Sequence, residues 1–183
     1  MTVLWVAWSV LVVAVIIAVG ASFLGGAQGA KAKLRNVLTV LAALAAVLTL
    51  ILGLAARLDE DPTVVPEVLV IAVSVLFAVS FGGPLTELIF QLASRQDQVE
   101  ESPKADPSPL RGGLWIGLLE RSAIVATLWA HWPEGIAVVL AVKGLGRFAE
   151  LKNHQAAEQF ILGTFSSCLV AAAGYGLGVL LLH

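Results

Sequence analysis

Charged side chains placed inside apolar stretches are the residues of this chain best suited to chemistry. An isolated charge in hydrocarbon costs at least about 2.5 kcal/mol even on lenient insertion scales, so such residues normally pair or line a water-filled path. Four carboxylates face three cations, a near balance that a self-paired network requires. The predicted site comprises Glu87, Glu120, Arg121, Lys143, Arg147, Glu150 and Glu158.

Two kinds of function fit this cluster. A desolvated carboxylate between cations has a proton affinity that its neighbours can tune widely, so Glu120 flanked by Lys143 and Arg147 suits a transporter or channel for a small ion or polar solute. The alternative is a structural or regulatory subunit whose buried ion pairs hold helices together or dock a partner. A water-accessible cleft reaching Glu120 would favour transport, and a dry, fully paired cluster would favour the scaffold.

Enzymatic motifs are missing from the sequence. It has no Walker loop, no Gly-x-Ser-x-Gly and no His-Glu-x-x-His. Its histidines, His131, His154 and His183, fall at separate ends of the expected helices and cannot converge on one metal. The sole cysteine, Cys168, excludes an internal disulfide. We therefore expect no enzyme activity, no metal and no cofactor, and the net charge of -2 offers no basic surface for nucleic acid.

The elements that position these charges are expected to be membrane-spanning helices. Hydrophobic residues form 58% of the 183 and charged residues 13%, whereas a soluble domain is about a quarter charged. The apolar residues occur in blocks of about 20, the length that crosses the hydrocarbon core. The sequence predicts an all-α, polytopic membrane protein with six transmembrane helices near 3–24, 37–56, 64–92, 113–130, 134–149 and 157–182.

The first apolar block is predicted to remain in the protein. It has no charged n-region, and it is longer than the roughly 7–15 residues of a signal-peptide core. Cleavage at the Ala-Gln-Gly-Ala stretch of 27–30 is the alternative.

Basic residues predict the orientation. They gather in alternate loops, at Lys31, Lys33 and Arg35, then Arg95, Lys104 and Arg111, then Arg147 and Lys152. The opposite loops offer Arg57 within the acidic run 59–61. Because cytoplasmic loops carry the excess of lysine and arginine, both termini should lie outside the cytoplasm. We expect the protein in a bacterial cytoplasmic (inner) membrane.

A polar segment with three prolines, 94–112, has the composition of a linker. It separates an N-terminal three-helix half, 1–93, from a C-terminal three-helix half, 113–183, which carries most of the charges. Because three is odd, the halves would enter the membrane in opposite senses, as inverted repeats do, although they share no residue-level similarity. A cytoplasmic protein partner could dock on this linker.

Small residues predict close helix packing. Gly113 and Gly117 share a helix face with Glu120, and small residues let neighbouring helix backbones approach. A second stripe on the last helix comprises Gly163, Ser167, Gly174 and Gly178. It packs either within the protomer or at the seam of a homo-oligomer, and we expect the protein to be a homo-oligomer. The run Gly82-Gly83-Pro84 predicts a kink before Glu87.

The second half resembles a known module. Its matching segments are 115–121 (Trp-Ile-Gly-Leu-Leu-Glu-Arg), 141–152 (Ala-Val-Lys-Gly-Leu-Gly-Arg-Phe-Ala-Glu-Leu-Lys) and 157–167 (Ala-Glu-Gln-Phe-Ile-Leu-Gly-Thr-Phe-Ser-Ser). Over about 111–182 they resemble the C-terminal membrane region of a bacterial integral-membrane family of unknown function. The resemblance brings no activity. It implies that the charged residues from Glu120 to Glu158 form one unit.

Overall fold

The computed structural model describes residues 2–26, 28–58, 65–97, 113–148 and 150–182, and all of its regular elements are helical. They are α1 (Thr2–Ser22), α2 (Ala30–Ala56), α3 (Glu67–Asp97), α4 (Gly113–Trp129), α5 (Gly135–Gly146), a 3-10 turn η1 (Glu150–Lys152) and α6 (His154–Leu182). The all-α prediction is confirmed. Of the predicted linker, residues 98–112 lie outside the described part of the chain.

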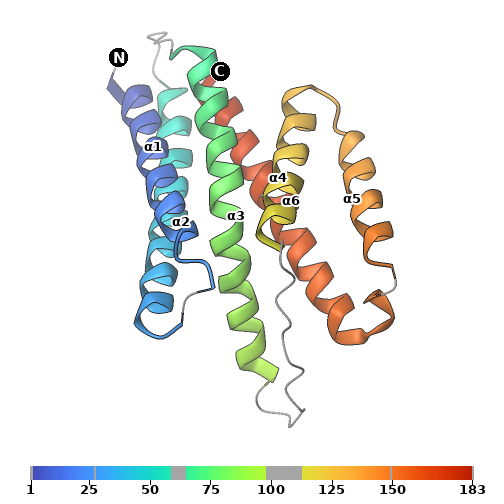
Figure 1. The fold of residues 1–183 in the computed structure, drawn as a ribbon. Helices are drawn as coiled ribbons and strands as arrows, with labels where there is room; N and C mark the ends of the chain where they lie inside the picture. The colour runs from blue at the N-terminus through green and yellow to red at the C-terminus, as the bar shows by residue number, and fades with distance from the viewer. Residues whose placement is uncertain (1, 27, 59–64, 98–112, 149, 183) are drawn as a thin grey trace.

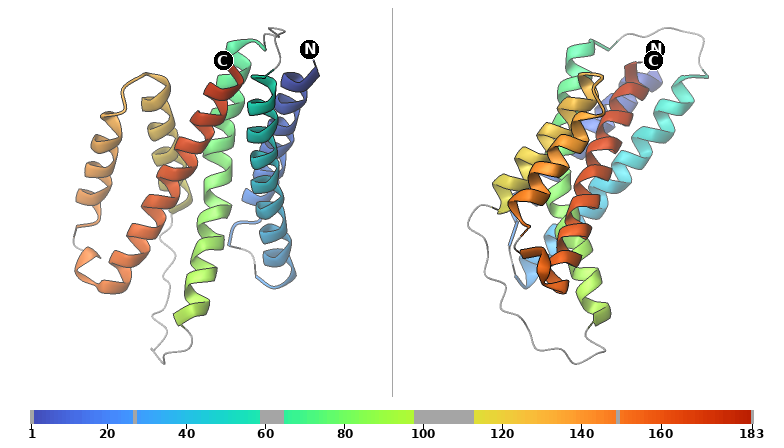
Figure 2. Two further views of the ribbon diagram at one scale, coloured as in Figure 1. Left: turned by 180° about the vertical axis from the view of Figure 1, so that it is seen from behind. Right: turned by 90° about the vertical axis from the view of Figure 1, so that its right-hand side faces the viewer.

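The helices form one bundle with α3 at its centre (Figure 1). The α1–α2 hairpin lies on one side of α3, and the α4–α5 hairpin lies on the other. Helix α6 crosses behind α3 and packs against both α3 and α4 (Figure 2). Both chain ends lie at one end of the bundle, and the α1–α2 and α5–α6 connections lie at the other.

Four of the described helices are long and apolar enough to cross a membrane: Val3–Ser22, Ala30–Ala56, Glu67–Ala93 and Ala156–Leu182. The other two are shorter, with 17 residues in α4 and 12 in α5. At about 1.5 Å per residue these two helices reach about 25 Å and 18 Å, against a hydrocarbon core of about 30 Å. Length and composition thus mark four of the six predicted spans.

The distribution of side chains is also typical of a membrane protein. Large apolar side chains face outward along the long helices, such as Ile51 at 57% exposure and Leu169 at 67%, where a soluble protein would present polar groups. Hydroxyl side chains lie inside instead. Thr39, Thr49 and Ser74 are fully buried, and each donates a hydrogen bond to a carbonyl of its own helix.

Several helix ends differ from the sequence prediction, among them the start of α2 and the end of α5. Helix α2 begins at Ala30 rather than near 37, because Ala, Lys, Leu and Arg favour helix although they lower hydropathy. Helix α5 ends at Gly146, three residues before the predicted end. Its last turn contains Gly144 and Gly146, which weaken a helix, and Arg147 leaves helical geometry at φ -115, ψ 9. Glu150 therefore belongs to η1 and not to α5.

Glycines on α6 bring that helix against α3. A Cβ at Gly174 would lie 2.8 Å from the Cβ of Ala78, and one at Gly178 would lie 2.9 Å from the Cβ of Ser74. Neither distance leaves room for a side chain. Trp129 of α4 contacts α3 at the same level, since its Nε1 donates a hydrogen bond to Ser74 Oγ at 3.2 Å. In this structure these two glycines pack helices within one protomer.

Candidate functional site

Helices α4 and α5 are joined by a buried ion pair between Glu120 and Lys143. Lys143 Nζ lies 2.5 Å from Glu120 Oε1, and the side chains are 16% and 6% exposed, respectively. The ammonium group also lies 5.4 Å from the centre of the Phe160 ring on α6. Pairing compensates the desolvation of both charges, and removal of either would leave the other buried alone.

Arg121 connects α4 to α3. It is 6% exposed, and its Nε donates to the carbonyl of Val79 at 3.1 Å. A Cβ at Gly82 would lie 2.2 Å from Arg121 Cδ, and one at Gly117 would lie 3.1 Å from its Nη1. Glycines on both helices thus form a notch that fits the arginine side chain and that an alanine at position 82 would fill.

Pro84 frees a backbone carbonyl at the same level of α3. The proline lies inside the helix and has no N–H for the carbonyl four residues earlier, which belongs to Ser80. Ser22 of α1 supplies the missing donor, with its Oγ 2.8 Å from the Ser80 oxygen. The Gly82-Gly83-Pro84 run therefore serves two contacts, one to α4 and one to α1.

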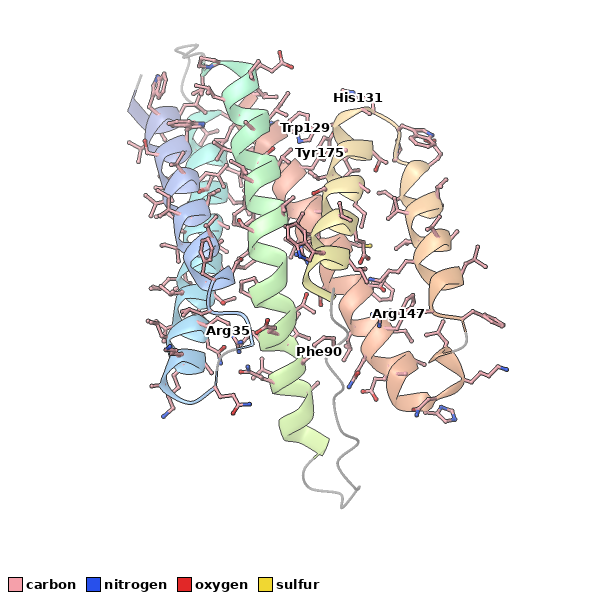
Figure 3. All side chains as sticks on the ribbon, viewed as in Figure 1. Arg35, Phe90, Trp129, His131, Arg147 and Tyr175 are labelled. Atoms are coloured by element: carbon pink, nitrogen blue, oxygen red, sulfur yellow. The ribbon has the colours of Figure 1, made fainter. Side chains whose placement is uncertain are left out.

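A second ion pair joins α2 and α3. Arg35, 2% exposed, donates through Nη1 to Glu87 Oε2. Its Nη2 also contacts Asn36 Oδ1 at 3.3 Å, and Asn36 Nδ2 donates to Gln91 Oε1 at 2.7 Å. These four residues form a polar layer in the half of the bundle away from the chain ends, where Figure 3 shows Arg35.

The sequence alone predicts Arg35 in a cytoplasmic loop and outside the charged cluster. The signal was a stripe of small and polar residues in an otherwise apolar helix. Its buried members on α2 are Arg35, Thr39, Ala42, Thr49 and Gly53. Their spacing of three, four and seven residues marks one helix face.

A cleft of about 610 Å³ connects these features. Its walls come from α1, α3, α4, α5 and α6. Figure 3 shows two of its lining residues, Phe90 and Arg147, in the half of the bundle away from the chain ends. Most of the lining is apolar. Its charged members are Glu87, Glu120, Arg121, Lys143 and Arg147.

The remaining predicted residues take different places. Gly117, Gly163 and Ser167 line the cleft. Glu158 is exposed on the first turns of α6 and lies outside the cleft. Gly113 begins α4, and Glu150 begins η1 with a side chain that is not among the described parts. Five of the seven predicted charges thus border one cleft.

Within the described ranges, no three His, Cys, Asp or Glu side chains come together as a metal site would require. Comparison with protein-family models, curated protein sequences and solved structures finds no match to this chain. The site must therefore be interpreted from its own geometry, and the resemblance of 111–182 to a bacterial membrane family stays a prediction.

Proposed function

We propose that this protein is a multi-pass transporter or channel of the bacterial cytoplasmic membrane that moves a small ion or polar solute through the charged cleft. The observation that carries the proposal is the position of the buried ion pair. Both Glu120 and Lys143 line the cleft and are within reach of a solute. Glu120 is the ionisable centre, and Lys143 is the counter-charge that it would release or regain as a proton or solute binds.

The cleft favours this function over a purely structural one. A pair that only holds helices together needs no open volume beside it, and native interiors rarely keep voids larger than a water molecule. About 610 Å³ lies beside this pair, which is the size of small-ligand sites.

A structural or regulatory membrane subunit is the second candidate. It is favoured by the two ion pairs, Glu120–Lys143 and Arg35–Glu87, because each connects a different pair of helices. In that case a cytoplasmic partner would dock on 94–112, most of which lies outside the described residues.

The proposed topology has six crossings, with both chain ends outside the cytoplasm. The four long helices span the bilayer, and α4 and α5 form a shorter pair of crossings in which α4 lies against α6 and α3. Lys31, Lys33, Arg147 and Lys152 then lie at the cytoplasmic end, as the positive-inside rule requires. The outer face of α5, with Val142 66% and Leu145 76% exposed, would contact lipid or a second copy of the chain.

A flux assay tests the proposal. Purified protein in liposomes is given proton and potassium gradients, and the wild type is compared with Glu120→Gln and with Glu158→Gln, which changes an exposed carboxylate outside the cleft. We expect flux in the wild type and Glu158→Gln and none in a folded Glu120→Gln. Unchanged flux in Glu120→Gln would reject the role of this carboxylate. No flux in any protein, with Glu120→Gln destabilised, would favour the structural subunit.

A further inference from the structure

The cleft carries an excess of positive charge. Three cations and two carboxylates line it, and both carboxylates already have a partner. Glu120 pairs with Lys143, and Glu87 pairs with Arg35, which lies outside the lining. Of the other two cations in the lining, Arg121 is buried, at 6% exposure, and Arg147 is half-buried.

The guanidinium of Arg121 has hydrogen-bonding capacity to spare. Its Nε is occupied by the Val79 carbonyl. Among the described residues no hydrogen bond joins Nη1 or Nη2 to a partner, and Arg121 is one of the residues that line the cleft. A cationic side chain that is only 6% exposed thus contributes to the wall of the cleft with N–H groups beyond the one that the Val79 carbonyl accepts. Buried charged donors of this kind are normally satisfied.

The notch fixes the direction of these donors. Gly82 and Gly117 hold the arginine stem between α3 and α4, and a Cβ at Gly83 would lie 3.7 Å from Nη2. A guanidinium held in this way presents paired N–H groups that match a carboxylate or phosphate. The complementary ligand group is therefore an oxyanion.

The apolar lining of the rest of the cleft indicates that the remainder of the ligand is apolar. Apolar side chains from several helices form its wall, including Val19, Phe23, Phe90, Ile116 and Phe160. We propose that Arg121 binds the oxyanion head of an amphipathic anion, a carboxylate or phosphate joined to a hydrocarbon body that lies along this wall. The inference rests on the proposed function in naming its substrate class, but binding can be measured without flux.

Calorimetric titration with hexyl phosphate tests the assignment. The protein is placed in nanodiscs of phosphatidylcholine, a zwitterionic lipid with no net charge. Inorganic phosphate serves as a probe that lacks the tail, and hexanol as one that lacks the charge. The variants are Arg121→Gln, Arg121→Lys and the exposed control Arg57→Gln. Gly83→Leu adds a variant that keeps the arginine but directs bulk toward Nη2.

We expect saturable binding of hexyl phosphate to the wild type and to Arg57→Gln, with both comparison probes weaker. Arg121→Gln should weaken it by about tenfold or more, the size expected for losing hydrogen bonds to a charged group. Arg121→Lys should recover part of the loss. If Arg121→Gln does not fold, Gly83→Leu should show the same weakening. No saturable binding to the wild type, or equal affinity in the wild type and whichever of these variants folds, would overturn the proposal.

Nanodiscs that contain phosphatidylglycerol distinguish two sources of the anion. Loss of hexyl phosphate binding there assigns the site to a lipid headgroup, and retained binding assigns it to a soluble amphipathic anion. The two proposals also fail separately. Binding in a protein without flux keeps the site and rejects transport, whereas flux without binding rejects the ligand class.

Discussion

Gly82→Ala is the perturbation that tests the Arg121 notch most sharply. The new methyl group would lie 2.2 Å from Arg121 Cδ and 2.7 Å from its Nε, which no real contact allows. These atoms are in the middle of the side chain rather than at its flexible end, so the whole arginine must move. Its hydrogen bond to the Val79 carbonyl, 3.1 Å long, is then lost.

The expected cost follows from three contributions. Overpacking costs about 1–3 kcal/mol, and loss of a hydrogen bond from a charged group costs about 1.5–3 kcal/mol. Replacing glycine by alanine inside a helix returns about 1 kcal/mol. The net loss in free energy of unfolding is therefore about 1.5–5 kcal/mol.

Thermal or denaturant unfolding in detergent, followed by tryptophan fluorescence, measures this loss. Gly176→Ala on α6 is the matched control, since its Cβ would meet no atom within 4 Å, and it should change stability by no more than about 1 kcal/mol in the favourable direction. In an Arg121→Ala background the cost of Gly82→Ala should disappear. An equal cost with and without the arginine side chain would refute the reasoning.

Three further substitutions have defined outcomes in the same unfolding assay. Glu120→Ala should cost about 3–5 kcal/mol because Lys143 is left buried and unpaired, and Lys143→Ala should add little to it; additive losses would contradict the pairing. Gly178→Ala would place a methyl group 2.6 Å from a tryptophan ring carbon and should cost about 1–3 kcal/mol, so a neutral result would contradict the α6 packing. Arg35→Ala should cost less than Glu120→Ala, since the Glu87 side chain is 39% exposed and can be solvated; the reverse order would show that the Arg35 layer is the more deeply buried of the two.

The all-helical architecture could be read from the sequence because apolar blocks of membrane length leave few alternatives. The same pattern gave the long helices within a few residues. The prediction failed where hydropathy and helix propensity diverge. At the start of α2, Lys31 and Lys33 lower the hydropathy but keep a high helix propensity. It also failed at the end of α5, where Gly144 and Gly146 shorten a helix that remains apolar.

The residues of the site were partly predictable from the sequence, but their partners were not. Charged residues within apolar segments can be recognised from the sequence, because a charge in hydrocarbon is costly. Glu120 and Lys143 are predicted site residues on this ground alone. Their partners depend on how helices pack, which spacing along one helix does not determine. Arg35 lies 52 residues before Glu87 in the chain, and the notch around Arg121 is formed by glycines that a sequence reading assigns to a kink or to packing.

The central claim is that water and solutes reach Glu120 through the cleft from the cytoplasmic side. It is tested by cysteine accessibility in a Cys168→Ser background, which removes the sole native thiol. Ser80→Cys places a thiol in the cleft lining, and Ser74→Cys places one on the same helix at a fully buried position outside it. With a charged, membrane-impermeant thiosulfonate applied from the cytoplasmic face, the account predicts modification of Ser80→Cys and none of Ser74→Cys. Absence of modification at both positions, or modification of Ser80→Cys from the opposite face only, would contradict it.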